Sequence, residues 1–461
     1  MGVLSQTVQF HPDLLKKYDR PAPRYTSYPT APMFSQEFDV ADLHQAIATG
    51  NQQKSPISLY CHIPFCESAC YFCGCNTIIT RNRRIVPPYL DRVFQNIDQI
   101  ASLVDSQRQV TQMHWGGGTP NYLNLHQIKK LWSKFRDSFQ FTEDAEISIE
   151  ISPRYVDRNY IFFLRDLGFN RISFGIQDFN QQVQEAINRI QPEEMLFDVM
   201  SWIREAGFDS ANVDLVYGLP HQTLATFGDT LEKTLGLDPN RIAVFSFAYV
   251  PWMKPVQKNI PTEALPSAEE KLDILKLTIE KLTNGGYRFI GMDHFAKPED
   301  ELAIAQEQGK LHRNFQGYTT QEEADLLAFG ATSISMLDDV YVQNHKTLKE
   351  YYQAIDNGEI PIAKGVKLKP EDKIRRDAIK QIMANFTLDK NAFSQRHNLD
   401  FDSYFADVNE QLQEFVEDGL VVNSPEKIQV TPAGRLLVRN VAALFDAYLN
   451  QDLKPRLSQA V

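Results

Sequence analysis

The sequence predicts an α/β fold in which helices cover a parallel β-sheet. Strand and helix patterns alternate six times between Ile57 and Tyr249. Two of the helix patterns end at a glycine, Gly168 or Gly207, and each glycine is followed by an aromatic residue and a new strand pattern. Because strands joined by helices run parallel, six such units in a row imply one parallel sheet with the helices outside it.

Each element of the repeat has its own signal. The first strand places Ile57, Leu59, Cys61 and Ile63 in alternation with other residues, as a strand requires. The second strand ends at residues 113–115, and the four later strands cover 145–151, 169–175, 208–217 and 241–249. The first two helices of the repeat cover 89–104 and 125–139.

The rest of the chain divides into three parts in our prediction. Prolines at positions 21, 23 and 29 deny regular structure to an N-terminal arm, residues 1–35. A catalytic domain follows over 36–365, with a proline-rich loop at 251–266, a strand through Gly291–Phe295 and a helix near Thr320–Ala328. Residues 366–461 form helices and short strands without glycine-rich loops, which is typical of a mainly helical, winged-helix-like domain.

Composition excludes several classes of protein. The net charge of −12 argues against a nucleic-acid surface, and no run of about 18 apolar residues indicates a membrane span. The N-terminus lacks the basic start and apolar core of a signal peptide. Five thiols without a disulfide framework favour a reducing compartment, so we expect a cytoplasmic protein, and we expect it to be a monomer.

All five cysteines of the 461-residue chain lie between Cys61 and Cys75. Disulfides within so tight a cluster would be strained. Zinc prefers two cysteine pairs set well apart, whereas closely spaced thiolates in one loop are typical of an iron–sulfur cluster. The spacing Cys66-x3-Cys70-x2-Cys73-x-Cys75 therefore favours iron–sulfur over zinc. Cys61 alternates with Leu59 on the strand, which indicates a buried core thiol rather than a ligand.

The Cys-x3-Cys-x2-Cys spacing, with Phe72 before the last cysteine, resembles the signature of the radical S-adenosylmethionine (SAM) enzymes. Longer stretches resemble one family among them, the oxygen-independent coproporphyrinogen III oxidases, and the resemblance runs over nearly the whole chain. The matching stretches are Tyr60–Cys75, His114-Trp-Gly-Gly-Gly-Thr-Pro120, Glu146–Glu150, Gly291–Phe295 and Phe315–Thr320.

The resemblance implies an open (β/α)6 partial TIM barrel, with the chemistry at the carboxyl ends of the strands. It implies that Cys66, Cys70 and Cys73 bind a [4Fe–4S] cluster and leave the fourth iron open to SAM. The implied contacts to that SAM are Tyr60, Gly117, Glu150 and Ile334. The implied contacts to a second SAM are Phe72, Gly118, Thr119, Gln177, Arg189, Asp214 and Ala248.

The residues themselves suit these roles. Gly116-Gly117-Gly118 lets backbone amides approach a ligand, although a simple turn is the alternative. Glu150 ends a strand and is suited to pairing with the amino group of SAM. For Arg189 and Asp214 the alternative is an ordinary ion pair, but Asp214 interrupts an apolar strand, where a carboxylate needs a cationic partner or a ligand.

The resemblance also implies the reaction. One electron, from a donor such as a flavodoxin or a ferredoxin, cleaves SAM, and the resulting radical takes hydrogen from a propionate β-carbon of coproporphyrinogen III. Loss of CO2 and an electron leaves a vinyl group, and two such events give protoporphyrinogen IX. Catalytic roles fall to Cys75, Tyr60 and Glu150; for Cys75 the alternatives are a fourth sulfur near the cluster and a residue that only shapes the loop. The candidates for binding the substrate propionates are Arg20, Arg24, His294 and Arg313.

Two further hypotheses come from other classes of protein. A heme-binding chaperone on the same scaffold would bind cluster and SAM without oxidising anything. Cys75, the basic arm and the stretch from Phe315 favour the enzyme over the chaperone. A zinc-binding structural protein is the third hypothesis, and the cysteine spacing disfavours it.

Overall fold

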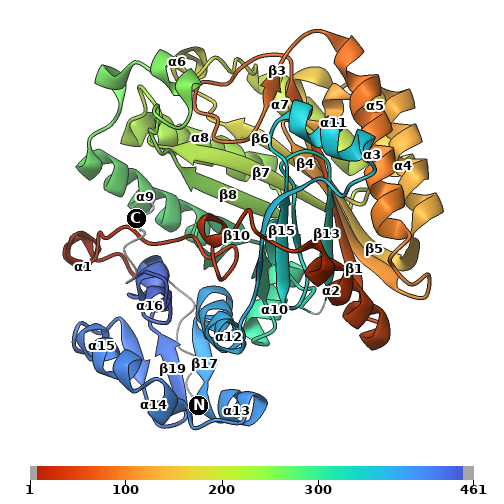
Figure 1. Ribbon diagram of the computed structural model, residues 1–461. Helices are drawn as coiled ribbons and strands as arrows, with labels where there is room; N and C mark the ends of the chain where they lie inside the picture. The colour runs from red at the N-terminus through yellow and green to blue at the C-terminus, as the bar shows by residue number, and fades with distance from the viewer. Residues whose placement is uncertain (1–7, 323, 450–461) are drawn as a thin grey trace. The chain divides into compact units, whose positions relative to one another are not determined.

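A computed structural model describes residues 8–322 and 324–449 (Figure 1). The chain divides into two compact units, each assembled from segments that are distant in sequence. The larger unit comprises Phe34–Lys271 and Glu323–Lys367. The smaller unit comprises Met1–Met33, Leu272–Glu322 and Leu368–Val461.

The larger unit contains the predicted parallel sheet. Its six successive strands are hydrogen-bonded neighbours in chain order, and every neighbouring pair is parallel, which confirms the prediction. These strands are β1 (Ile57–Ile63), β4 (Gln109–Gly117), β5 (Gln140–Ile151), β6 (Arg171–Gln177), β7 (Ser210–Tyr217) and β8 (Arg241–Ser246).

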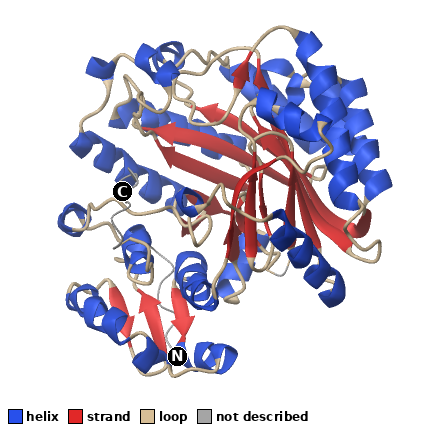
Figure 2. Ribbon diagram, viewed as in Figure 1, coloured by secondary structure: helices blue, strands red, loops and turns tan. Residues whose placement is uncertain are grey.

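Helices connect these strands and line the outer side of the sheet (Figure 2). Gly168 and Gly207 end two of the helices with positive φ values of 107° and 76°, as a residue without Cβ allows. The helices of this unit are α2 (Val40–Gln53), α3 (Val86–Ala101), α4 (Leu125–Ser138), α5 (Arg158–Leu167), α6 (Gln181–Ala186), α7 (Glu193–Ala206), α8 (Leu224–Leu237) and α11 (Leu348–Asp356).

The prediction of a helix near Thr320–Ala328 is wrong. The chain forms strand β13 (Asp325–Phe329) there, parallel to β1 on the side opposite β4. All five residues of β13 are buried, and such a short apolar run has no alternation by which to distinguish a buried strand from a helix. Three antiparallel strands continue the sheet from β13: β14 (Ile334–Met336), β15 (Val340–Asn344) and β16 (Ile362–Lys367).

The smaller unit contains the C-terminal helices and a small sheet. Three short antiparallel strands, ordered β17-β19-β18, lie among helices, as the winged-helix-like prediction requires. The elements of this segment are α12 (Pro370–Asn385), β17 (Thr387–Asp389), α13 (Lys390–His397), α14 (Phe401–Tyr404), α15 (Ala406–Glu417), β18 (Val421–Asn423), β19 (Lys427–Val430) and α16 (Val438–Ala443).

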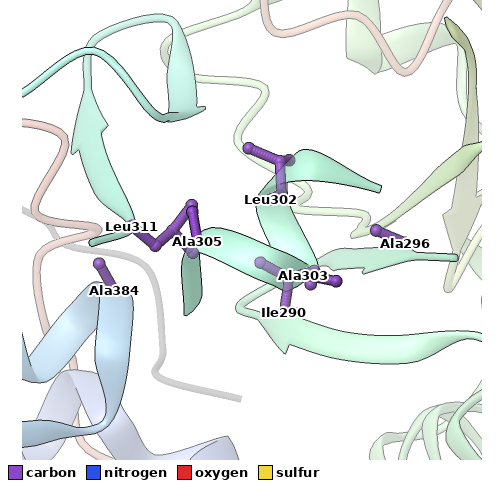
Figure 3. Packing of buried hydrophobic residues seen from close by; sticks show 7 residues of the cluster. All are labelled: Ile290, Ala296, Leu302, Ala303, Ala305, Leu311 and Ala384. Carbon is purple, nitrogen blue, oxygen red and sulfur yellow. The ribbon is translucent and has the colours of Figure 1, made fainter. Parts of the chain in front are cut away.

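A second segment of the smaller unit packs on α12. Figure 3 shows Ala384 of α12 beside buried residues of this segment, among them Ile290 and Leu311. The Gln306 side chain joins the two parts, since it donates to the carbonyl of Ala384 at 2.8 Å and to that of Ile290. The segment comprises β9 (Arg288–Gly291), β10 (His294–Ala296), α10 (Glu301–Glu307), β11 (His312–Asn314) and β12 (Gly317–Thr319), and α9 (Ala268–Asn284) leads into it.

The N-terminal arm, described from residue 8, is packed rather than free. It has one short helix, α1 (Pro12–Lys17), and otherwise little regular structure. Tyr18 and Tyr28 are about 2% exposed or less, and the Asn440 side chain donates to the Tyr18 carbonyl at 2.9 Å. The arm is therefore part of the core of the smaller unit.

A buried ion pair fixes β13 within the larger unit. The Nη2 of Arg108 donates to Oδ2 of Asp325 at 2.5 Å, and the Arg108 side chain is 0% exposed. Replacing Asp325 by Ala should lower the free energy of unfolding by about 3–5 kcal/mol, because the guanidinium stays buried without its counter-ion. Urea unfolding would measure the change.

The matched control is the exposed pair of Arg158 and Glu205, which are 3.0 Å apart. Replacing Glu205 by Ala should cost about 1 kcal/mol or less, because water solvates the remaining charge. Equal costs for the two substitutions would contradict the assignment of β13 to the core.

Candidate active site

A cavity of about 440 Å³ lies in the larger unit, at the carboxyl ends of the parallel strands. The cysteine loop forms one wall, and the others are formed by residues in or just after β4 and β5, by residues of β6 and β7, and by residues 253–256 after β8. Most of the predicted site residues line it: Cys66, Cys70, Phe72, Cys73, Cys75, Gly117, Gly118, Thr119, Glu150, Gln177, Arg189 and Asp214.

Three of the predicted SAM contacts are not among the residues that line this cavity. Tyr60 lies on β1, where its hydroxyl is 3.0 Å from Nδ1 of His62 and its ring stacks on His114 at 5.9 Å. Ala248 follows β8, and its carbonyl accepts a hydrogen bond from a glutamine side chain. Ile334 begins β14.

The cysteine loop has little regular structure, but backbone hydrogen bonds hold it in place. It leaves β2 (Phe65–Cys66), which pairs with β3 (Ile78–Ile79), so both ends of the loop meet in one short ladder. In the middle of the loop, the N–H of Tyr71 donates to the carbonyl of Ile187 at 2.9 Å. The positions of the thiols are thus set by contacts of the protein itself.

The electrostatic surroundings of the thiols differ. Burial raises the pKa of Cys66 to about 12, whereas a hydrogen bond with the Cys75 thiol lowers the pKa of Cys73. Two guanidinium groups face Cys70: Nη1 of Arg189 is 3.4 Å from its Sγ, and Nη2 of Arg154 is 3.7 Å from it. The two guanidinium groups thus place positive charge and N–H donors beside this sulfur.

A hydrogen-bond network fixes the carboxylate of Glu150. Nε2 of His114 lies 3.2 Å from Oε1, and the N–H of Gly117 donates to Oε2 at 3.4 Å. Burial raises the pKa of Glu150, but the hydrogen bond and the charge of His114, together with the Gly117 N–H, outweigh burial and lower it below its usual value. The carboxylate is therefore anionic and suited to an ammonium group.

A second acidic group faces the cavity from β7. Burial and the nearby charge of Glu150 raise the pKa of Asp214 to about 7, although Asn212 and Arg189 oppose the rise. The Asn212 side chain donates to Asp214 at 2.9 Å. Arg189 is held at the neighbouring strand, where its Nη2 donates to the carbonyl of Gly175, the β6 residue opposite Asp214, at 2.9 Å.

Three residues of this site are absent from the sequence-based predictions. His114 and Arg154 touch the Glu150 carboxylate and the Cys70 thiol, and Nζ of Lys254 donates to the carbonyl of Cys75 at 2.9 Å. His114 stands in one of the quoted motifs, so its place before the glycines could have identified it. Arg154 lies 84 residues beyond Cys70, and Lys254 lies 179 residues beyond Cys75. No pattern in the sequence indicates that either residue contacts the loop.

The four candidate substrate residues lie in the smaller unit. Arg24 pairs with Asp293, and Arg20 is exposed with its guanidinium 6.0 Å from the Tyr18 ring centre. Arg313 is 5% exposed, and its Nε and Nη1 have no hydrogen-bond partner among the described residues. His294 packs its ring edge-on against Tyr318, with ring centres 5.3 Å apart.

Comparisons with known proteins agree with this geometry. A family model described as the Radical SAM superfamily matches residues 60–234, and one described as the HemN C-terminal domain matches residues 368–437. The oxygen-independent coproporphyrinogen III oxidase of Synechocystis is 60% identical over 98% of both chains. The protein of the same name from Escherichia coli is 48% identical over 98% of both chains.

A solved structure described as "Coproporphyrinogen III oxidase (HemN) from Escherichia coli is a Radical SAM enzyme" matches with a TM-score of 0.92 and 48% identity, covering 96% of this chain and 100% of that one. The partial barrel and its cysteine loop make this chain a radical SAM protein. Within that superfamily it belongs to the family of oxygen-independent coproporphyrinogen III oxidases.

Membership of the superfamily implies a [4Fe–4S] cluster and SAM. The thiols fit the cluster better than a single ion. Cys66, Cys70 and Cys73 carry free thiols on one cavity, yet no three His, Cys, Asp or Glu side chains of residues 8–322 and 324–449 are placed to hold one metal ion. A cluster takes each thiolate on a different iron, so its ligands need not converge on one point.

The helices of the described chain include none with both the length and the apolar character that crossing a bilayer demands.

The sequence predicts Cys66, Cys70 and Cys73 as the three cluster ligands, so on that prediction replacing any one of them by Ser should abolish iron binding. Iron and sulfide assays after anaerobic reconstitution would measure the loss. The control is Cys61→Ser: Cys61 is 0% exposed within β1 and does not line the cavity, so this variant should keep its iron. A Cys66 variant with full iron content would contradict the ligand assignment.

Asp214 should make stability depend on pH. Because its folded-state pKa of about 7 lies above the ordinary value of 3.8, the folded chain keeps a proton that the unfolded chain has released. Its contribution to stability is therefore lost as pH rises from about 4 to about 7. Asp214→Asn should flatten this slope by up to about 1.4 kcal/mol per pH unit, measured by urea unfolding.

The slope should be reduced rather than removed, because burial also raises the pKa of Asp178, to about 6. An unchanged slope in Asp214→Asn would contradict the assigned burial of Asp214.

Proposed function

We propose that this chain catalyses the oxidative decarboxylation of two propionate side chains of coproporphyrinogen III to vinyl groups, giving protoporphyrinogen IX in porphyrin biosynthesis. The observation that carries the proposal is one cavity lined by four free thiols, three of them in the Cys-x3-Cys-x2-Cys spacing, together with Glu150 and Arg189. Its support is a full-length relative, 60% identical, that is named for coproporphyrinogen III oxidation without oxygen.

In this proposal Cys66, Cys70 and Cys73 hold the [4Fe–4S] cluster. When bound, cluster and SAM supply a one-electron cleavage that yields a radical able to abstract a hydrogen atom. The protein residues bind and orient the reactants. Glu150, kept anionic by His114, would accept hydrogen bonds from the SAM amino group, and Tyr60, Gly117 and Ile334 would complete this site.

A second SAM is part of the proposal. Two carboxylates on different strands support it, because Glu150 on β5 and Asp214 on β7 could each pair with one amino group. Arg189 is suited to a SAM carboxylate, since its Nε is buried without a hydrogen-bond partner in the described chain. The residues assigned to this second molecule are Phe72, Gly118, Thr119, Gln177, Arg189, Asp214 and Ala248.

Arg20, Arg24, His294 and Arg313 are assigned to the propionates of the substrate. Arg313 gives the main support, because two of its buried donors lack a hydrogen-bond partner among the described residues and a carboxylate would satisfy them. Burial also lowers the pKa of Arg313, and an anionic ligand would oppose that cost.

The remaining parts of the proposal concern the context of the enzyme. Each turnover needs an electron-donor protein, such as a flavodoxin or a ferredoxin. We propose that the protein acts as a monomer in the cytoplasm. The division into an arm, residues 1–35, a catalytic domain and a C-terminal domain from residue 366 stays a prediction.

Anaerobic turnover tests the function. The reconstituted protein, incubated with coproporphyrinogen III, SAM and dithionite, should form protoporphyrinogen IX, detected by chromatography after oxidation to the porphyrin. Cluster and SAM binding without any product would reject the proposal and favour the heme-binding chaperone.

Cys75 should be needed for turnover but not for the cluster. It lines the cavity two residues beyond Cys73, and the three other thiols suffice for ligation. Cys75→Ser changes little volume, so it should keep the iron content and SAM affinity of the parent and lose most of the product. Iron assay, SAM titration and product assay on this variant separate the roles. A rate near that of the parent would show that Cys75 only packs in the loop. A loss of iron would show that Cys75 is a cluster ligand.

A further inference from the structure

We propose that the electron donor is a small acidic protein that docks on the exposed face around the cysteine loop. This donor face is defined by Ile79, Arg81, Arg84, Met253 and Lys346, and the inference rests on the proposed function. Every residue of the face belongs to the larger unit.

The apolar centre of the donor face lies beside a cluster ligand. Ile79 pairs with Cys66 in the β2–β3 ladder, so its backbone is one strand spacing, about 4.8 Å, from that ligand. The N–H of Thr80 also donates to the Cys66 carbonyl at 2.9 Å. Ile79 is nevertheless 46% exposed, so a partner that touches it comes close to the cluster.

A second apolar residue stands at the other side of the loop. Met253 lines the cavity and is 63% exposed. The next residue, Lys254, donates to the carbonyl of Cys75 at 2.9 Å, which fixes this segment to the loop. Exposed apolar side chains on both sides of a redox site are suited to the centre of a protein interface.

Exposed basic side chains follow Ile79 directly along the chain. Residues 77–84 contain Arg81, Arg83 and Arg84 and no acidic residue. Glu67 and the carbonyl of Tyr122 engage Arg83, whereas Arg81 and Arg84 are exposed and form no ion pair within the described chain.

Lys346 adds a positive charge from another part of the sequence. Its carbonyl accepts a hydrogen bond from the Asn76 side chain at 3.4 Å, so it lies next to the loop, and its side chain is exposed without an ion pair to any described residue. The chain as a whole has a net charge of −12, so an excess of positive charge at this face differs from the acidic character of the rest of the protein.

These features fit one kind of partner. The reaction needs single electrons: the donor is oxidised by one electron, and the cluster held by the three thiolates is reduced by one. A basic rim steers an acidic protein to the loop and repels basic ones, while the apolar centre supports a short-lived contact. A small acidic flavodoxin or ferredoxin has this chemistry.

The test compares protein and chemical reductants. In the reconstituted enzyme, Arg81→Glu combined with Arg84→Glu should slow cluster bleaching by reduced flavodoxin at least tenfold at low salt, and the difference should shrink at high salt. Bleaching and product formation with dithionite should stay at the parental rate, because neither arginine lines the cavity. Calorimetric titration with oxidised flavodoxin should show weaker binding, independent of turnover.

The control makes the same charge change elsewhere, with Lys54→Glu and Lys129→Glu. Lys54 ends α2 at the amino end of β1, and Lys129 is exposed on α4. This variant should be reduced by flavodoxin at the parental rate. Equal slowing in both variants, no slowing in either, or slowing with dithionite as well would overturn the inference. A parent chain that flavodoxin reduces but that forms no product would reject the proposed function and leave the docking result standing.

Discussion

The close approach of two backbones is the constraint on which the site depends. The N–H of Gly118 donates to the carbonyl of Ile63 at 2.8 Å, and the N–H of Thr119 donates to that of Phe65 at 3.0 Å. A Cβ on Gly118 would lie 2.7 Å from the Phe65 carbonyl, and Gly117 has a φ of 123°. Only glycines permit this contact, which fixes where the chain leaves β1 and enters the cysteine loop.

Much of the fold could be predicted, because strand and helix periods are local. The parallel strands from Ile57 to Ser246 follow in chain order, and glycines such as Gly168 mark the helix ends. Strand β13 could not be predicted in the same way. Its partner β1 precedes it by more than 250 residues. The pairing of the two strands is a long-range contact, and a short apolar run does not indicate whether it will form such a contact or a buried helix.

In the candidate site, too, the residues that are close together in the sequence could be predicted and those from distant segments could not. The cysteine loop is contiguous, so its spacing was sufficient to predict a cluster. The sequence also predicts a role for the glycines at the end of β4, but in binding a ligand, whereas the structure shows that Gly118 makes room for the backbone at Pro64 and Phe65. Arg154 and Lys254 reach the loop from distant segments, and only the folded chain identifies them.

The anchoring of the cysteine loop bears on how the protein matures. Both ends of the loop and its middle are tied by bonds such as those from Thr80 to Cys66 and from the Asn188 side chain to the Ala69 carbonyl at 2.7 Å. None of these bonds involves iron, unlike a zinc finger, whose chain is unfolded without its metal. Because these anchors join only protein atoms, the loop can form before the cluster is inserted.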